Sequence, residues 1–279
     1  MKHSMVVTDL DGTLLHRSGS LGKQDAESLQ MLGDRGVLRI IATGRSLYSA
    51  HRVLGPETPI DYLVFSSGAG IVEWKSQRIV QKHTMSVEQV KTAVNLLMHM
   101  NLEFMVHEPI PDNHRFQYIE TGRYNLDFIR RTDIYRDFAT PATQSSFVYG
   151  DACQIVAVEP GDVNRSSYTS IAAALDSFTV IRTTSPIDGE STWIEIFPSS
   201  VSKSLAAEWL RLEHDIPAQQ VLAVGNDYND LDLLTWAHHR YVVGNAPDEL
   251  KARFKSVSTN LENGFSDAVS RWLSRNHHR

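Results

Sequence analysis

An alternation of short apolar runs with single amphipathic helices is the feature that most constrains how this chain can fold. The apolar runs are rich in β-branched residues, as buried strands are, and the segments between them carry apolar residues at helical spacing. Strands that are separated by single helices pair in parallel through right-handed crossovers. The sequence therefore predicts an α/β fold around a parallel sheet. We predict its strands at residues 5–8, 37–42, 62–65, 193–197, 221–224 and 241–243.

The middle of the chain has a different pattern. A helix over about 87–100 is followed by several strand-like runs and by a second helix that ends at Leu175. This order is typical of an α+β domain. We predict that residues 83–187 form an inserted α+β domain, and that residues 1–82 and 188–279 form the two parts of the α/β core.

Composition narrows the class of protein. With 42% hydrophobic and 22% charged residues, the chain falls in the range of globular domains rather than of disordered or fibrous proteins. The formal charge of −6 disfavours general binding to nucleic acid, and the longest unbroken apolar run, 171–175, is far too short to span a membrane. The single cysteine, Cys153, excludes an internal disulfide and fits a reducing compartment, so we expect a cytoplasmic protein without nucleic-acid or membrane partners.

Two carboxylates follow the first predicted strand, in the segment Asp9-Leu10-Asp11-Gly12-Thr13. Alternate residues of an extended segment face the same side, so Asp9 and Asp11 can point into one site. In open α/β sheets ligands bind beyond the carboxyl ends of the strands, and oxygen ligands at that edge suit Mg²⁺. Taken alone, the same segment is also typical of a solvated turn.

Two further segments could bind an anion. Thr43-Gly44-Arg45 ends the second predicted strand, where a hydroxyl and the N–H groups of a following helix would meet a phosphate. An ordinary helix cap by Thr43 has the same sequence. Lys203 stands at the start of a predicted helix, where a cation opposes the helix dipole unless an anion lies nearby. A solvated surface lysine is equally consistent with that position.

The segment Gly225-Asn226-Asp227-Tyr228-Asn229-Asp230 follows the strand at 221–224 and, taken alone, could be a turn that caps a helix. Each of these four segments is weak evidence by itself. Together they all follow predicted strands, at the edge where ligands bind. Two of them supply oxygen ligands for a cation and two supply donors for a phosphate, so the combination predicts a site where both meet.

In order and spacing, the four segments resemble motifs one to four of the haloacid dehalogenase (HAD) superfamily. The insertion between the second and third motifs is similar to the large cap of its Cof-like and sucrose-phosphatase-like sugar phosphatases, and so is the sequence at 195–198. The resemblance implies a Rossmann-like HAD core with an inserted α+β cap that closes over the site and selects the substrate. It also implies a Mg²⁺-dependent phosphomonoester hydrolase acting on small phosphorylated metabolites, above all sugar phosphates.

The resemblance also assigns roles to single residues. Asp9 would be the nucleophile that forms an aspartyl-phosphate, and Asp11 would be the general acid and then the base. The phosphoryl group would be bound by the N–H of Leu10 and by Thr43, Gly44, Lys203 and Asn229. Mg²⁺ would be held by Asp9, the main-chain oxygen of Asp11, Asn226 and Asp230.

The sequence departs from the family pattern in two places. The fourth motif normally begins Gly-Asp, but Asn226 stands at this metal position, and its amide oxygen carries no charge. Whether Asn226 or, by a local shift, Asp227 completes the metal site stays open. Ser67-Gly68-Ala69 replaces a frequent Asn-Gly-Ala. Two alternatives therefore stay open: a phosphotransferase or phosphomutase with the same motifs, and a non-catalytic phosphate-binding module.

Overall fold

The chain folds into two compact units, each with its own sheet. Unit 1 comprises Met1–Gln81 and Ser202–Arg279, and unit 2 comprises Lys82–Val201. The computed structural model describes residues 3–16, 19–161 and 167–276. Among these residues, every helix falls short of the length and apolar character that crossing a bilayer demands.

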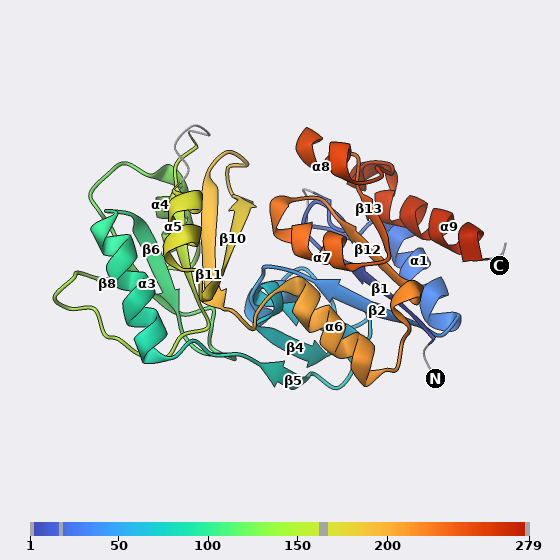
Figure 1. Cartoon of the computed structure of the whole chain (residues 1–279), viewed down its shortest axis with the longest axis horizontal. Coiled ribbons are helices and arrows are strands. Elements are labelled where there is room, and N and C mark those ends of the chain that lie inside the picture. The colour runs from blue at the N-terminus through green and yellow to red at the C-terminus, as the bar shows by residue number, and fades with distance from the viewer. Residues whose placement is uncertain (1–2, 17–18, 162–166, 277–279) are drawn as a thin grey trace. The chain divides into compact units, whose positions relative to one another are not determined.

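A seven-stranded sheet forms the centre of unit 1. Its strands are β1 (Ser4–Thr8), β2 (Val37–Ala42), β3 (Tyr62–Phe65), β4 (Gly70–Glu73), β5 (Arg78–Lys82), β12 (Val221–Gly225) and β13 (His239–Val242). They lie in the order β13-β12-β1-β2-β3-β4-β5 (Figure 1). The strands from β13 to β3 are parallel, and β4 runs antiparallel to β3. The predicted α/β fold with a parallel sheet is thus confirmed.

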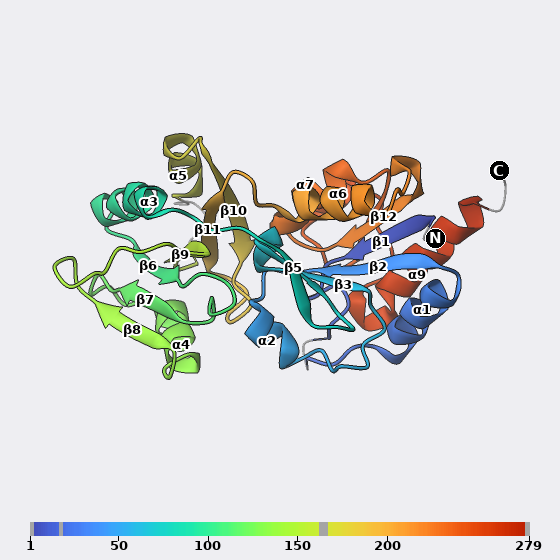
Figure 2. The same ribbon diagram turned by 90° about the horizontal axis from the view of Figure 1, so that it is seen from below.

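Helices cover both faces of this sheet, which is why its central strands are apolar on both sides. The helices of unit 1 are α1 (Lys23–Asp34), α2 (Leu47–His51), α6 (Lys203–Glu213), α7 (Leu231–Trp236), α8 (Asp248–Arg253) and α9 (Gly264–Asn276). Figure 2 shows α6 and α7 on one face of the sheet and α1 and α9 on the other. The main core of the unit joins Leu210 of α6 and Leu234 of α7 to Val7, Ile40 and Ala223 of the sheet.

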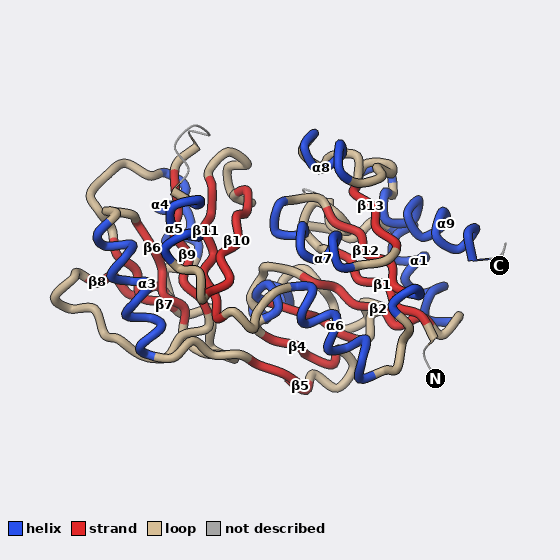
Figure 3. The backbone as a smooth tube through the Cα atoms, viewed as in Figure 1, coloured by secondary structure: helices blue, strands red, loops and turns tan. Residues whose placement is uncertain are grey.

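Unit 2 has a six-stranded sheet. Its strands are β6 (Glu103–His107), β7 (Phe116–Ile119), β8 (Ala139–Ala142), β9 (Gln154–Glu159), β10 (Phe178–Thr184) and β11 (Thr192–Pro198), in the order β10-β11-β9-β6-β7-β8 (Figure 3). All neighbours are antiparallel except β7 and β8.

The helices of unit 2 are α3 (Val87–His99), α4 (Leu126–Ile134) and α5 (Tyr168–Ala174) among the described residues. The sheet buries one apolar face with α3 and α5, around Phe104 and Ile194. On the opposite face Phe128 of α4 packs with Met105 and Trp193. Helix α3 begins at Ser86, whose capping box with Gln89 satisfies free N–H groups of the first turn.

The second predicted domain boundary is wrong. Residues 193–197 do form a strand, but β11 pairs with β9 and β10 in the sheet of unit 2, and the chain enters unit 1 again at Ser202. Residues 188–201 therefore belong to the inserted unit rather than to the core. An apolar run shows that a strand is buried, but it carries no information on which sheet receives it.

Candidate active site

The carboxyl ends of β1, β2 and β12 lie at one edge of the unit 1 sheet, because these strands are parallel and in register. Asp9 follows β1 directly, Thr43 follows β2, and Asn226 follows β12. The Asp9 N–H still donates to Val224 O on the neighbouring strand, at 2.9 Å. The edge that the sequence predicted as the ligand site thus brings the polar segments together.

A buried ion triad occupies this edge. Lys203 begins α6, and its Nζ donates to Asp9 Oδ1 at 2.6 Å and to Asp230 Oδ1 at 2.5 Å. The exposed fraction of the Lys203 side chain is 0%, against 5% for Asp9 and 0% for Asp230. The surface-lysine alternative is therefore wrong: the cation at the start of the helix is offset by two carboxylates.

The triad shifts the proton affinity of its members. Burial, followed by the charge of Asp230, raises the pKa of Asp9 from 3.8 to about 7, although Lys203 opposes the shift. Burial alone would lower the pKa of Lys203, but the two carboxylates outweigh it and raise that pKa above its ordinary value. Lys203 therefore stays protonated and can hold an anion in this site.

Asp230 is buried and accepts hydrogen bonds from the loop that follows β12. Its Oδ1 accepts from Lys203, and its Oδ2 accepts the N–H groups of Asn226 and Asp227 at 2.8 and 3.2 Å. In return, the Asp227 carboxylate caps the 3₁₀ turn at Tyr228–Asp230. This chain's own donors thus engage both Asp230 oxygens, and Asp227 serves as a cap. The assignment of Asp230 to the metal stays a prediction.

Asp11 contacts an arginine. Its two oxygens accept from Nε and Nη2 of Arg45, each at 2.7 Å, in a bidentate pair that is partly exposed. Our sequence reasoning gave Arg45 no role, although it stands in the segment of the second motif. Its place three residues after a buried strand is the signal that could have found it.

Thr43 does not cap a helix. Its Oγ1 accepts the N–H of Arg45 at 3.1 Å, whereas α2 starts at Leu47 and is capped by Ser46. Thr43 is 1% exposed. Gly44 therefore lies in a loop and not at the predicted helix N-terminus. An anion bound here would meet the N–H groups of this loop.

Two glycines let the loops approach closely. Gly68 has φ of 107°, and a Cβ there would lie 2.2 Å from Ser202 O, at the start of α6. Gly12 has φ of 75° and packs against the amide of Asn226. A side chain at Gly68 would push α6, and with it Lys203, away from Asp9.

The oxygens expected around Mg²⁺ do converge. One end atom of the Asn226 amide lies 3.1 Å from Asp9 Oδ2, 2.9 Å from the carbonyl oxygen of Asp11 and 3.0 Å from Thr13 Oγ1. Neighbouring ligands of an octahedral Mg²⁺ with bonds of about 2.1 Å lie about 3.0 Å apart. The distances from Asn226 to Asp9 and to the Asp11 carbonyl therefore fit this ion.

The donor set also fits Mg²⁺ in its chemistry. Across the described residues, no three histidine, cysteine or acidic side chains are grouped as they are in an all-protein metal cage. Mg²⁺ usually takes one or two carboxylates and completes its shell with water and substrate phosphate. The carboxylate of Asp9, the carbonyl of Asp11 and the amide of Asn226 are a donor set of this kind.

The remaining predicted residues lie around this cluster. Leu10 sits between the two aspartates with its side chain fully buried, which leaves only its main chain toward the edge. Asn229 lies in the 3₁₀ turn next to Asp230 and is partly buried. The structure thus places both in the same loops as Asp9 and Asp230.

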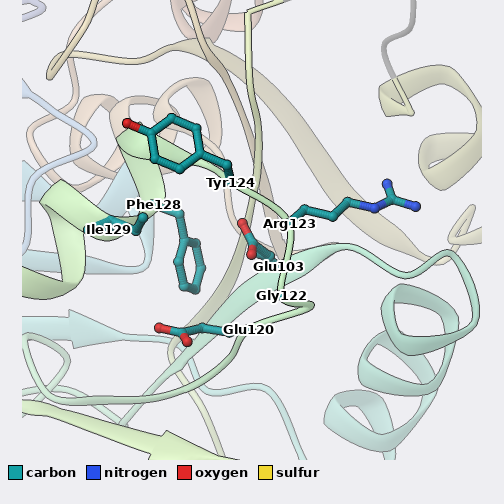
Figure 4. A pocket seen from close by; sticks show the side chains of 7 residues that line it. All are labelled: Glu103, Glu120, Gly122, Arg123, Tyr124, Phe128 and Ile129. Carbon is teal, nitrogen blue, oxygen red and sulfur yellow. The ribbon is translucent and has the colours of Figure 1, made fainter.

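A separate pocket lies within unit 2, with a volume of about 240 Å³. The residues around it are Glu103, Glu120, Gly122, Arg123, Tyr124, Phe128 and Ile129 (Figure 4). The Glu103 side chain is buried, and its Oε2 has no hydrogen-bond partner among the described residues. Figure 4 shows the Arg123 guanidinium pointing away from the Glu103 carboxylate.

Known proteins are similar to this chain over nearly its whole length. The 5-amino-6-(5-phospho-D-ribitylamino)uracil phosphatase YwtE of Bacillus subtilis is 24% identical, over 96% of this chain and 98% of its own. A second phosphatase of that description in the same organism, YitU, is 24% identical over 98% of each chain.

Solved structures share the fold. A protein of Streptococcus mutans UA159 superposes with a TM-score of 0.79 at 16% identity, over 98% of this chain and 99% of that chain. A HAD subclass IIB sugar phosphatase gives a TM-score of 0.75 at 17% identity, over 96% and 98%. The family model for haloacid dehalogenase-like hydrolases matches residues 6–273. Since this match spans nearly the whole sequence, the chain belongs to the haloacid dehalogenase-like hydrolases.

Proposed function

We propose that this protein is a Mg²⁺-dependent phosphatase that hydrolyses phosphomonoesters of small polyhydroxylated metabolites, sugar phosphates above all. The observation that carries the proposal is the carboxylate of Asp9, which is buried at the carboxyl end of β1 and held by Lys203 at 2.6 Å. A second carboxylate, Asp11, stands two residues further on. A nucleophile and an acid–base group are thus on one turn.

The reaction has two steps in this proposal. Asp9 attacks the phosphorus atom, so that a bond forms from its carboxylate oxygen to phosphorus and the bond to the leaving oxygen breaks. Asp11 gives that oxygen a proton. Water then attacks the aspartyl-phosphate, Asp11 takes a proton from the water, and inorganic phosphate leaves Asp9 free again.

The neighbouring residues bind and position. Lys203, Thr43, Gly44, the N–H of Leu10 and Asn229 would hold the phosphoryl oxygens. Asp230 acts as a positioning residue, because it fixes both the ammonium of Lys203 and the loop at Asn226. Arg45 orients Asp11, and proton transfer requires Asp11 to give up at least one of its two contacts with that guanidinium.

Mg²⁺ would be held by Asp9 Oδ2, the carbonyl oxygen of Asp11 and the amide oxygen of Asn226, and when bound it would neutralise charge on the phosphoryl group. Phosphoryl transfer depends mainly on positioning and charge neutralisation, which is what these residues offer.

Two kinds of relative support the substrate class. YwtE and YitU are named for a phosphate ester of a ribityl chain, and a solved structure of the same fold is a sugar phosphatase. All of these names describe a phosphate on a polyhydroxylated carbon chain.

The test uses the full chain with Mg²⁺ and measures inorganic phosphate released from p-nitrophenyl phosphate. A panel then compares ribose 5-phosphate and glucose 6-phosphate with phosphoserine as the non-sugar control. We expect hydrolysis that favours the sugar phosphates and stops with EDTA or in Asp9→Asn, and we expect acid-quenched enzyme to carry phosphate on the Asp9 peptide.

Turnover that needs no metal, or an Asp9→Asn protein as active as the wild type, contradicts the mechanism. If the phosphoryl group appears on a second organic acceptor and not as free phosphate, the protein is a phosphotransferase. If phosphate esters bind but none reacts, it is a binding module.

A further inference from the structure

The Asn226 amide can stand in two orientations, and only one of them satisfies its neighbours by hydrogen bonds alone. Its end atom faces Asp9 Oδ2, the carbonyl oxygen of Asp11 and Thr13 Oγ1 at 2.9–3.1 Å. All of these can accept a hydrogen bond. An aspartate at this position could only add another acceptor.

With its nitrogen in this place, Asn226 has two N–H donors to share among the three oxygens that face it. The amide then does what a cation would do, because its N–H groups offset the charge of Asp9 Oδ2 and the dipole of the Asp11 carbonyl. Asp9 Oδ2 and the Asp11 carbonyl oxygen can thus be hydrogen-bonded without a metal ion.

With its oxygen in this place, Asn226 accepts from the Thr13 hydroxyl at 3.0 Å but sets its own oxygen against Asp9 and Asp11. Oxygens that face one another at about 3 Å without a hydrogen between them repel, and a cation among them removes that repulsion. The two orientations differ by a half-turn of χ2, a torsion with broad, roughly two-fold preferences.

We propose that Asn226 is an exchangeable stand-in for the divalent cation. In the metal-free protein its amide nitrogen bonds Asp9 and the Asp11 carbonyl, and on metal binding the amide turns so that Oδ1 becomes a ligand. The inference rests on the proposed function only for the choice of Mg²⁺. Its consequence is a site that is stable when empty and that binds Mg²⁺ more weakly than an aspartate would allow.

The direct test observes the Asn226 side-chain amide by NMR in the ¹⁵N-labelled full chain, with the signal assigned by its loss in Asn226→Asp. In EDTA we expect this NH₂ group to exchange slowly with solvent, because its hydrogens are bonded. Titration with MgCl₂ alone should shift the signal and speed its exchange. A signal that stays unchanged while calorimetry shows Mg²⁺ binding overturns the proposal.

The second test measures Mg²⁺ affinity and thermal stability in Asn226→Asp. The aspartate adds a negative charge to the site and donates no hydrogen bonds to Asp9 or Asp11 that Mg²⁺ would have to break. We therefore expect its apparent Kd for Mg²⁺ to fall at least tenfold. Its Tm in EDTA should lie below that of the wild type and should be restored by Mg²⁺. The matched control, Asn95→Asp, adds the same charge at an exposed position of α3 and should leave Mg²⁺ affinity unchanged.

Equal Mg²⁺ affinity in the wild type and Asn226→Asp, or an Asn226→Asp protein as stable in EDTA as the wild type, also overturns the proposal. These readouts do not depend on turnover. If the amide responds to Mg²⁺ but no phosphate ester is hydrolysed, the proposed function fails and the role of Asn226 stands. If hydrolysis requires Mg²⁺ and the amide does not respond, the reverse holds.

Discussion

Replacing Lys203 by methionine should destabilise unit 1 strongly, although methionine has a similar length and is apolar. The ammonium of Lys203 is the cation that the structure places between Asp9 and Asp230, at 2.6 and 2.5 Å. All three side chains are at most 5% exposed, so water cannot replace the lost contacts. The variant leaves two buried carboxylates facing each other without compensation.

The size of the loss follows from this burial. Removing one partner of a buried ion pair typically costs about 3–5 kcal/mol, because the other charge is left unpaired. In domains of this size each kcal/mol lowers Tm by about 2–4 °C, so Tm should fall by roughly 6–20 °C. A partly exposed pair would lose no more than about 1 kcal/mol.

The loss should also depend on pH. Burial and Asp230 raise the pKa of Asp9 from 3.8 to about 7 in the folded protein. Since the folded state binds this proton more tightly than the unfolded state does, the free energy of unfolding falls as the pH rises from 3.8 toward 7. Lys203 opposes that shift, so its removal enlarges the effect, and Lys203→Met should lose more stability at pH 8 than at pH 5.

The assay is urea unfolding followed by far-UV circular dichroism, in EDTA, at both pH values. Asp230→Asn and the double variant Lys203→Met/Asp230→Asn complete a cycle, in which we expect the double loss to be smaller than the sum of the single losses. A loss below about 1 kcal/mol for Lys203→Met, the same loss at both pH values, or strictly additive losses would refute the reasoning.

Three further predictions test other parts of the structure. Gly68→Ala should lower the free energy of unfolding by about 2 kcal/mol or more and reduce kcat, since a Cβ there would lie 2.2 Å from Ser202 O. Urea unfolding and steady-state kinetics measure the two effects, and a variant with unchanged stability and kcat contradicts the prediction. Arg45→Met should change the free energy of unfolding by no more than about 1 kcal/mol, because its pair with Asp11 is partly exposed. It should lower kcat, because Asp11 loses the side chain that orients it, and the same two assays check both effects. Glu103→Gln should raise Tm, because it replaces a buried carboxylate whose Oε2 has no hydrogen-bond partner in the described part of the chain. A lower Tm in calorimetry would show that the carboxylate is compensated in the wild type.

Local sequence was enough for most of the strands that carry the site. The buried strands that became β1, β2 and β12 were predicted within a residue or two, because a strand covered on both faces needs an unbroken apolar run. The polar segments that follow them were therefore placed at the right edge, and the resemblance to the HAD superfamily is confirmed by the family model. The chemical roles given to those residues stay predictions.

Other elements carried a weaker local signal. The edge strands β5, β8 and β10 and the helices α4 and α8 were not predicted, because partly exposed segments have no clear apolar period. The short buried strand β4, between β3 and β5, was not predicted either. Strand β11 was predicted as a strand but assigned to the wrong sheet.

What the sequence determined by itself is the order of the buried parallel strands β1, β2, β3, β12 and β13 in unit 1 and the kinds of polar residue that follow β1, β2 and β12. Those features depend on residues that are close together in the chain, through the spacing of apolar residues and the alternation of side chains along a strand. Tertiary structure alone decided that Lys203 is buried between carboxylates, that Arg45 pairs with Asp11, and that the Asn226 amide faces the Asp9 carboxylate. These contacts join side chains that are far apart in the sequence, by 194 positions for Asp9 and Lys203. Their geometry comes from how helices and loops pack on the sheet, which no local pattern encodes.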